Sequence, residues 1–249
     1  MIEPLVRRGT DAAVIELGYG TLAPGETATG PAAEETLAVI LSGTVAAAIE
    51  GRPLGRAGAR ANPFQEPGHA VYAPPGEVLE LTANGGGATV VIAAAPAGPD
   101  APGTGRIIEP GEQRITEPGR DGFARTVRTI LGPEDRASRL IAGETLNPAG
   151  GWSSYPPHKH DTHRPPEEAM LEEVYLFRVQ PAGGFGVQML YDQKRERAFM
   201  VHDGDVAVIR SGYHPVVAAP GYELYYFWVL AGEGRQMAPW VDPDHAWIA

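Results

Sequence analysis

Two histidines separated by a single residue are the first feature of this sequence that could do chemistry. His158 and His160 lie in the segment SSYPPHKHD, which begins at Ser153. Side chains two positions apart on a β-strand point to the same face, so both imidazoles can face one site. Neutral imidazole is a good ligand for zinc, iron and nickel, and two of them supply half of a four-ligand site. The spacing favours a metal site, although a His-x-His pair is also common among surface histidines.

Two further side chains could complete the ligand set. Glu173 precedes the apolar run VYLF, where burial of a carboxylate is costly unless it is paired or bound to a metal. His214 follows a glycine turn and begins another apolar run, in SGYHPVVAA. The order His-x-His, Glu and a distant His resembles that of the metal-binding cupins, in which a small β-barrel gathers four side chains inside it. We expect one divalent metal ion, zinc first, with manganese, iron or nickel as alternatives. Its ligands would be His158, His160, Glu173 and His214.

Several acidic residues between the histidines and Glu173 are rival ligands. Residues 161–172, DTHRPPEEAMLE, make this separation longer than is usual in cupins, and we expect them to form an inserted lid or rim loop. Glu172 should point to the opposite face of the strand from Glu173. If the site transfers protons, its base would be Glu173 or, second, Glu168. A solvated acidic loop is the simpler interpretation of the glutamates in this segment. We expect ordinary roles for the remaining histidines, His69, His163, His202 and His245.

Short apolar runs bounded by glycine and proline recur along the chain and predict an all-β protein. The 32 Gly and 24 Pro residues indicate many turns between short strands. No long segment shows helical periodicity, although a short helical turn over 136–143 remains an alternative. The expected strands are 36–41, 45–50, 69–73, 78–83, 89–95, 125–131, 139–146, 173–179, 185–191, 206–212 and 223–232.

A weak internal repeat predicts two β units of similar plan. The segment PGHAVYAPPG aligns with DGDVAVIRSG, which places Gly76 under Gly212, 136 positions apart. Glu35 precedes the apolar run LAVIL, as Glu173 precedes VYLF. The first unit has no counterpart of the histidine ligands, so we expect its role to be structural.

The segment 95–105, APAGPDAPGTG, interrupts the strand pattern and resembles a linker. We therefore predict an N-terminal domain of residues 1–105, which includes the linker and lacks metal ligands. Residues 106–249 would form the metal-binding domain.

Charge and composition exclude several classes of partner. The formal net charge of −11 argues against nucleic acid and anionic membrane surfaces. The sequence contains no cysteine, which excludes disulfides and thiolate chemistry. No apolar stretch resembles a signal peptide or approaches the roughly 18 residues of a membrane span, so we expect a cytoplasmic protein. The strand edges that a β protein exposes are compatible with a homo-oligomer.

Several strings closely resemble the 5-deoxy-glucuronate isomerases of inositol catabolism: SSYPPHKHD, LEEVY, DGDVAVIRSGYHPV, APGYELYY and DPDHAWI. The resemblance runs over nearly the whole chain and implies a bicupin, with two antiparallel double-stranded β-helix barrels and a divalent metal in the second. The implied reaction converts 5-deoxy-D-glucuronate to 5-dehydro-2-deoxy-D-gluconate through a metal-chelated cis-enediolate. The sequence departs from the family pattern at two places that bear on the identity of the substrate. Met189 stands where the family pattern has a basic residue, and QKRER (193–197) replaces a more acidic turn.

A small sugar-acid substrate would need a cation for its carboxylate and polar partners for its hydroxyls. Alternation places Lys159 and Arg178 on the face opposite to the ligands, whereas Arg210 could point inward. An ordinary surface charge is the simpler interpretation of each of these cations. By residue type alone, Gln188 and Tyr226 could bind hydroxyls.

Two other functions fit the same ligand set. A cupin dioxygenase would use iron and consume oxygen. A non-catalytic bicupin that binds sugar acids would keep its metal in a closed site without an open coordination position.

Overall fold

A computed structural model describes residues 1–100 and 102–248 of the chain. These residues form β-strands joined by turns, with three single-turn 3-10 helices, so the predicted all-β class is confirmed. Within this described part, no helix is long and apolar enough to cross a membrane.

The chain divides into two compact units, each built from distant parts of the sequence. Unit 1 contains Met1–Arg114, Ile130–Ile141 and Ala231–Arg235. Unit 2 contains Ile115–Thr129, Ala142–Leu230 and the residues from Gln236 onward. The predicted domains 1–105 and 106–249 stay a prediction.

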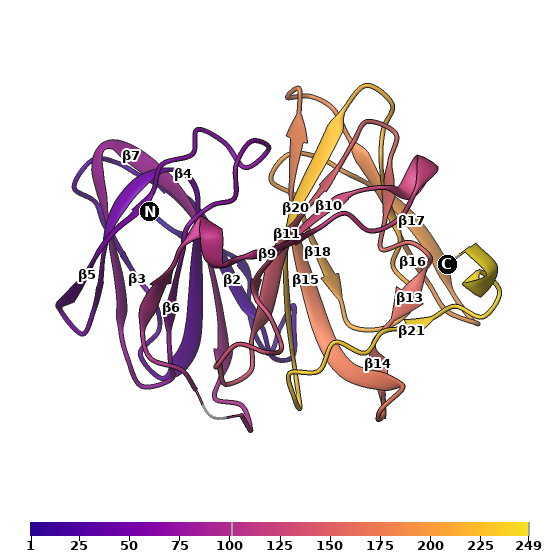
Figure 1. Ribbon diagram of the computed structural model, residues 1–249, viewed down its shortest axis with the longest axis horizontal. Helices are drawn as coiled ribbons and strands as arrows, with labels where there is room; N and C mark the ends of the chain where they lie inside the picture. The colour runs from indigo at the N-terminus through magenta and orange to yellow at the C-terminus, as the bar shows by residue number, and fades with distance from the viewer. Residues whose placement is uncertain (101, 249) are drawn as a thin grey trace. The chain divides into compact units, whose positions relative to one another are not determined.

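Unit 1 is organised around two long antiparallel strands (Figure 1). Its elements are β1 (Glu3–Val6), β2 (Glu16–Leu22), β3 (Thr27–Thr29), β4 (Glu34–Ile49), β5 (Arg52–Gly58), β6 (Ala70–Ala73), β7 (Leu79–Pro96), β8 (Arg106–Ile108) and the 3-10 helix η1 (Pro110–Glu112). Strand β4 pairs with β7 over its whole length, while β5 and β6 pair with β4, and β2 and β3 pair with β7. The apolar side chains enclosed by these strands form the core of the unit.

Glycine explains why two predicted strands become one in both β4 and β7. Gly43 has φ +76° and Gly87 has φ +75°, a left-handed conformation that costs glycine little. A Cβ on Gly43 would collide with the carbonyl oxygen of Gly87. The two strands therefore bend together at this point while their pairing continues, whereas the sequence pattern predicted that each strand ends there.

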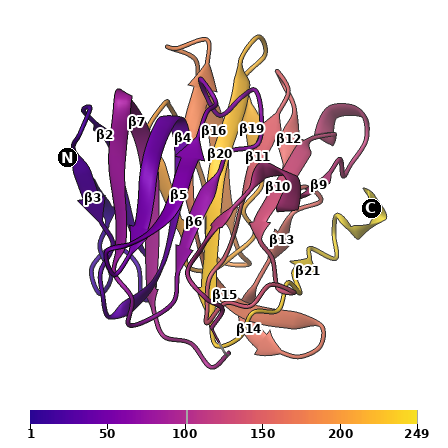
Figure 2. The same ribbon diagram turned by 60° about the vertical axis from the view of Figure 1, so that its left-hand side comes forward.

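Unit 2 contains two larger sheets and a two-stranded ribbon (Figure 2). The remaining elements are β9 (Arg114–Thr116), η2 (Asp121–Phe123), β10 (Thr126–Leu131), β11 (Ile141–Asn147), β12 (Trp152–Ser153), β13 (His158–Lys159), β14 (Asp161–Arg164), β15 (Glu168–Gln180), β16 (Gly186–Tyr191), β17 (Glu196–Val201), β18 (Val206–Ile209), β19 (Val216–Ala218), β20 (Glu223–Gly232), β21 (Trp240–Val241) and η3 (Ala246–Ile248). One sheet has the order β14-β15-β20-β11-β10-β9, with β18 on β15, and the other has the order β12-β19-β16-β17. Strand β13 pairs with β21. The alternative helical turn over 136–143 is not formed.

The two units share one three-strand arrangement, which fits the predicted repeat. In unit 1 β4 lies between β6 and β7, and in unit 2 β15 lies between β18 and β20. Gly76 and Gly212, which the repeat aligns, have φ of +92° and +90°. Unit 1 contains a single histidine, His69, whose Nε2 pairs with Glu109 Oε2 at 2.9 Å.

Glu35 shows what unit 1 does with the carboxylate that the repeat aligns with Glu173. Its side chain is fully buried and accepts hydrogen bonds from the Tyr72 hydroxyl at 2.6 Å and from the backbone N–H groups of Arg139 and Leu140, both at 2.7 Å. The backbone N–H of Ser138 also donates to it. Backbone donors therefore satisfy this carboxylate, without any histidine.

Candidate metal centre

Three of the four predicted ligands meet inside unit 2. One ligand atom from each of His160, Glu173 and His214 lies within 4.8 Å of the other two, and all three side chains are buried. Glu173 Oε2 is 3.1 Å from His160 Nε2 and 3.2 Å from His214 Nε2. These three residues form the ligand cluster.

Local pairing positions each member of the cluster. Glu173 lies within β15, opposite Ile209 of β18. His160 follows β13, and its carbonyl accepts a hydrogen bond from the Leu171 N–H at 2.8 Å. The N–H of Gly212 donates to Asp161 Oδ2 at 2.7 Å, which ties the turn before His214 to the residue after His160. Segments far apart in the sequence are thus held against one another by main-chain hydrogen bonds and by the carboxylate of Asp161.

Backbone carbonyls fix the orientation of all three imidazoles. Nδ1 of His160 lies 2.8 Å from the carbonyl oxygen of Leu171, and Nδ1 of His214 lies 3.0 Å from that of Gly212. Nδ1 of His158 lies 3.3 Å from the carbonyl oxygen of Pro156. Each Nδ1–H can donate to its carbonyl, which leaves Nε2 as the nitrogen that can bind a metal.

The cluster fits a divalent cation. Nε2 of His214 is buried and forms no hydrogen bond, although the carboxylate oxygen of Glu173 is only 3.2 Å away. With Nδ1–H on the carbonyl, a nitrogen lone pair faces a carboxylate oxygen, and a cation between them would turn repulsion into attraction. Metal–ligand bonds of about 2.0–2.2 Å place neighbouring ligand atoms roughly 2.9–3.4 Å apart in octahedral or tetrahedral geometry. The two separations from Glu173 Oε2, 3.1 Å and 3.2 Å, fall in this range.

Charges within the cluster shift its pKa values. Burial alone would raise the pKa of Glu173, but the hydrogen bond and charge of His160, together with His214, lower it well below its usual range. Burial opposes protonation of His160, yet the carboxylate of Glu173 outweighs burial and raises the pKa of this imidazole. A metal ion would therefore compete with a proton for His160 and bind a carboxylate that is already ionised.

His158 lies beside the cluster but is not among the three residues that meet. Its ring centroid is 4.8 Å from that of His214 and 6.4 Å from that of His160. Burial, with repulsion from the other two histidines, lowers the pKa of His158 to about 3. The imidazole is therefore neutral at pH 7 and has a lone pair for a metal. Its role as the fourth ligand stays a prediction.

Glu168 lies in a hairpin formed by β14 and β15, where the sequence predicted a lid or rim loop, and Lys159 lies in β13 just before this hairpin. Glu168 is fully buried, so it is not part of a solvated loop. It accepts hydrogen bonds from Lys159 Nζ at 2.6 Å, from Arg164 Nη2 at 2.8 Å and from two backbone N–H groups. Lys159 also pairs with Asp161. The roles predicted for Glu168 in catalysis and for Lys159 in substrate binding stay predictions.

The other predicted substrate-binding residues lie in different surroundings. Arg178 Nε pairs with Asp203 Oδ1 at 2.7 Å, and Arg210 is exposed after β18. The Gln188 carboxamide is fully buried and donates to the carbonyl of His214 at 2.9 Å, while its Oε1 has no hydrogen-bond partner. Tyr226 is buried and shares a hydrogen bond of 2.7 Å with Ser153 Oγ. Among these four, Gln188 contacts the main chain of a cluster residue.

Tyr175 is a buried polar residue near the cluster that the sequence analysis did not single out. Its ring centroid is 6.3 Å from that of His214 and 4.5 Å from that of Tyr226, and its hydroxyl shares a 3.0 Å hydrogen bond with Ser154 Oγ. Burial and the charge of Glu173 raise the pKa of Tyr175, so its hydroxyl stays protonated. The signal was available, because Tyr175 is two positions from Glu173 and so shares its face of β15.

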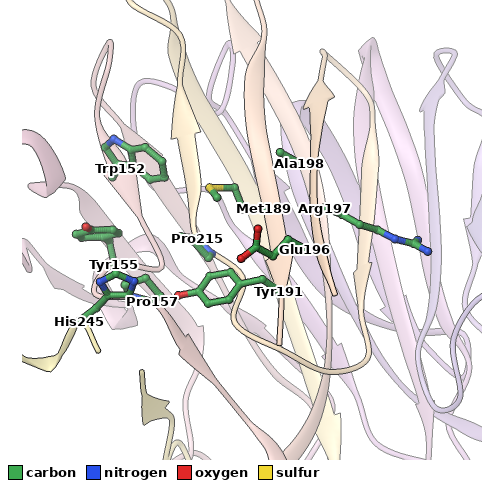
Figure 3. A pocket seen from close by; sticks show the side chains of 10 residues that line it. All are labelled: Trp152, Tyr155, Pro157, Met189, Tyr191, Glu196, Arg197, Ala198, Pro215 and His245. Carbon is green, nitrogen blue, oxygen red and sulfur yellow. The ribbon is translucent and has the colours of Figure 1, made fainter. Parts of the chain in front are cut away.

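A pocket of about 510 Å³ lies beside strand β16 (Figure 3). Met189 and Tyr191 line it, and strand alternation places them on the face that Gln188 does not share. Pro157 and Pro215, which are chain neighbours of His158 and His214, also line it. The two departures from the family pattern, Met189 and the segment 193–197, therefore both contribute to this pocket.

Comparison with known proteins gives consistent matches. The model of the KduI/IolB family matches residues 6–248. The 5-deoxy-glucuronate isomerase of Geobacillus thermodenitrificans is 38% identical over 198 residues, which cover 77% of this chain and 70% of that protein. The crystal structure of an IolB-like protein from Salmonella typhimurium has a TM-score of 0.92 and 30% identity, covering 99% of this chain and 94% of that one.

A more distant structural match concerns the fold alone. The crystal structure of oxalate decarboxylase from Lactobacillus farciminis has a TM-score of 0.65 at 14% identity, covering 95% of this chain and 85% of that one. Together with the antiparallel sheets of both units, this likeness confirms the predicted bicupin fold.

Proposed function

Because the chain belongs to the KduI/IolB family, we propose that it is an isomerase that converts 5-deoxy-D-glucuronate to 5-dehydro-2-deoxy-D-gluconate. The substrate is a small sugar acid, and the step belongs to inositol catabolism. A cytoplasmic location, as predicted from the sequence, fits such a step. No nucleic acid or membrane takes part in this function.

The ligand cluster is the observation that carries the proposal. His160, Glu173 and His214 offer two imidazole nitrogens and a carboxylate oxygen to one point. We propose that this point holds one divalent metal ion, for which zinc is the first choice, and that His158 is the fourth ligand. A cation bound there supplies a Lewis acid for the substrate carbonyl and its neighbouring hydroxyl.

Glu173 is the proposed base. An aldose–ketose isomerisation removes the proton from carbon 2 of the aldose and returns it to carbon 1, while the hydroxyl proton moves from oxygen 2 to oxygen 1. Both histidines of the cluster contact Oε2 of Glu173, which leaves Oε1 to take and return the carbon-bound proton. Glu168 ranks second as the base, because its carboxylate already accepts hydrogen bonds from Lys159, Arg164 and two backbone N–H groups.

Tyr175 would assist from the same face of β15. Its hydroxyl remains protonated and shares a hydrogen bond with Ser154, so it can donate to a substrate oxygen but cannot compete with Glu173 as a base.

Metal analysis and an isomerase assay test the proposal together. The purified chain should contain close to one equivalent of a divalent metal and should interconvert the aldehyde and ketone forms of the substrate. Removal of the metal with a chelator should abolish turnover, and addition of zinc, manganese, iron or nickel should restore it. A metal-loaded protein that binds the sugar acid without forming the ketone would refute the enzymatic role. Oxygen consumption by the iron-loaded protein would instead identify a dioxygenase.

A further inference from the structure

The proposed substrate carries a carboxylate, and the basic residues predicted to bind it have other surroundings. Lys159 pairs with Asp161 and Glu168, and Arg178 pairs with Asp203. Arg210 is exposed. A half-buried cation whose only partners are carbonyl groups would suit the substrate carboxylate better.

Arg125 has the required freedom. It lies between η2 and β10 and is half-buried, and its backbone N–H donates to the carbonyl of Pro118 at 3.2 Å. Its Nη1 donates to the carbonyl oxygens of Phe123 at 3.2 Å and Tyr155 at 3.1 Å. No carboxylate within residues 1–100 and 102–248 pairs with this guanidinium. Its charge is therefore anchored by neutral groups only.

The remaining donors of Arg125 have the geometry that a carboxylate needs. A guanidinium has five N–H donors, and the two carbonyls occupy only those of Nη1. Nε and Nη2 stay available, and these two nitrogens can bind both oxygens of a carboxylate side by side. Because the carbonyls already fix the plane of the guanidinium, little further ordering is needed when the carboxylate binds.

Tyr175 links the surroundings of Arg125 to the ligand cluster. Burial lowers the pKa of Arg125, and its charge interacts with the phenols of Tyr226 and Tyr175, which oppose that shift. The Tyr175 ring is 6.3 Å from the His214 ring. The Tyr155 carbonyl that anchors Arg125 is one residue from Ser154, whose hydroxyl bonds to Tyr175. The cluster would hold the aldehyde end of a six-carbon sugar acid. The carboxylate at the other end of the molecule would then extend past Tyr175 toward Arg125.

We propose that Arg125 binds the carboxylate of the sugar-acid substrate and thereby selects uronates over neutral aldoses. This role rests on the proposed function, because it assumes that the cluster holds the aldehyde end of the same molecule.

Charge-selective kinetics with the metal-loaded full chain test this role. The substrates are 5-deoxy-D-glucuronate and 5-deoxy-D-glucose, in which a neutral CH2OH group replaces the carboxylate. Arg125→Met should lower kcat/KM for the uronate by about 100-fold and change it for the neutral sugar by less than about threefold. Arg125→Lys should recover part of the loss, since it restores the charge without the paired donors. If the neutral sugar turns over too slowly, its inhibition constant against the uronate replaces kcat/KM and should be unchanged.

Arg120→Met is the matched control. Arg120 belongs to the same loop, is exposed and donates to the carbonyl of Ile248 at 2.8 Å. Its replacement should not distinguish the two sugars. Equal loss for both sugars in Arg125→Met would show that Arg125 only supports the loop at Tyr155, and the proposal would be wrong. Selective loss in Arg178→Met or Arg210→Met would assign the carboxylate to that residue instead. Failure of the isomerase proposal can be told apart from failure of the role of Arg125, because the metal-loaded wild-type protein would then not turn over the uronate.

Discussion

His160 and His163 are histidines of one short segment in opposite environments. His160 is buried with Nε2 beside Glu173, whereas His163 is exposed on β14. His160→Ala removes one of three atoms that meet at the proposed metal position, so the dissociation constant for zinc should rise at least about 100-fold. His163→Ala should leave it unchanged. Titration calorimetry of the metal-free proteins measures both values, and equal affinities would contradict the assignment of His160.

His158 tests whether the site has a fourth protein ligand. Its ring centroid is 4.8 Å from that of His214 and its imidazole is neutral at pH 7, so Nε2 is available to a metal bound in the cluster. We expect His158→Ala to remove metal binding and isomerase activity, while circular dichroism and the melting temperature stay close to wild type. Global unfolding of this variant would show that the histidine has a structural role instead.

Residue types and strand alternation predicted the cluster, because these depend on local sequence. Alternation placed Glu173 inward and Arg178 on the other face, and Arg178 is found in an ion pair with Asp203. The partners of Glu168 were not predictable, since they depend on the register of the β14–β15 hairpin. The contact of Arg125 with Tyr155 joins residues 30 positions apart through loops, for which no sequence period exists.

At the scale of elements, the β14–β15 hairpin holds the residues on either side of His160. Glu168 Oε1 accepts the backbone N–H groups of Asp161 at 3.1 Å and Thr162 at 3.2 Å, in addition to Lys159 Nζ. The carboxylate thus fixes the backbone immediately after His160. The segment predicted to be an inserted lid or rim loop is held by a buried, charged hydrogen-bond network.

Glu168→Gln tests the strength of this hairpin. The amide loses the negative charge that pairs with Lys159 and Arg164, so we expect the free energy of unfolding to fall by about 3 kcal/mol. Glu167→Gln is the matched control. Glu167 is the exposed neighbour of Glu168, so its replacement should change the free energy of unfolding by less than about 0.5 kcal/mol. Urea denaturation of both variants gives the comparison, and similar values would show that the network contributes little.

Strand boundaries were the part of the fold that the sequence predicted least well. A glycine inside an apolar run resembles a turn, yet Gly43 and Gly87 allow two paired strands to bend without ending. Short strands such as β12, β13 and β21 have only two residues each, which is too few to produce a periodic signal. The long apolar strands β15 and β20 were predicted because their pattern extends over many residues.

At the scale of the whole molecule, the two units use equivalent carboxylates differently. Glu173 faces imidazoles, while Glu35 accepts hydrogen bonds from the backbone N–H groups of residues 138–140. Those donors belong to unit 1 although they follow parts of unit 2 in the sequence. The family resemblance predicted the bicupin, but no pattern indicated that unit 1 takes up this later segment.

Because unit 1 includes residues 130–141, a cut near residue 105 separates parts of the same unit. A fragment of residues 106–249 keeps the backbone donors of 138–140 and loses their acceptor, Glu35, so buried N–H groups remain unpaired. We expect the fragment to be poorly soluble and to melt at a lower temperature than the full chain. Co-expression with residues 1–105 should restore soluble protein that binds metal. A stable, active fragment alone would contradict this expectation.

Main-chain carbonyls, rather than neighbouring side chains, orient His158, His160 and His214. An amino-acid replacement changes a side chain but leaves the peptide carbonyl in place. Relatives can therefore diverge around the cluster, or adapt to another substrate, without losing the correct tautomer of these imidazoles. Laboratory evolution of new specificity has the same freedom, provided that the backbone path through residues 156, 171 and 212 is preserved.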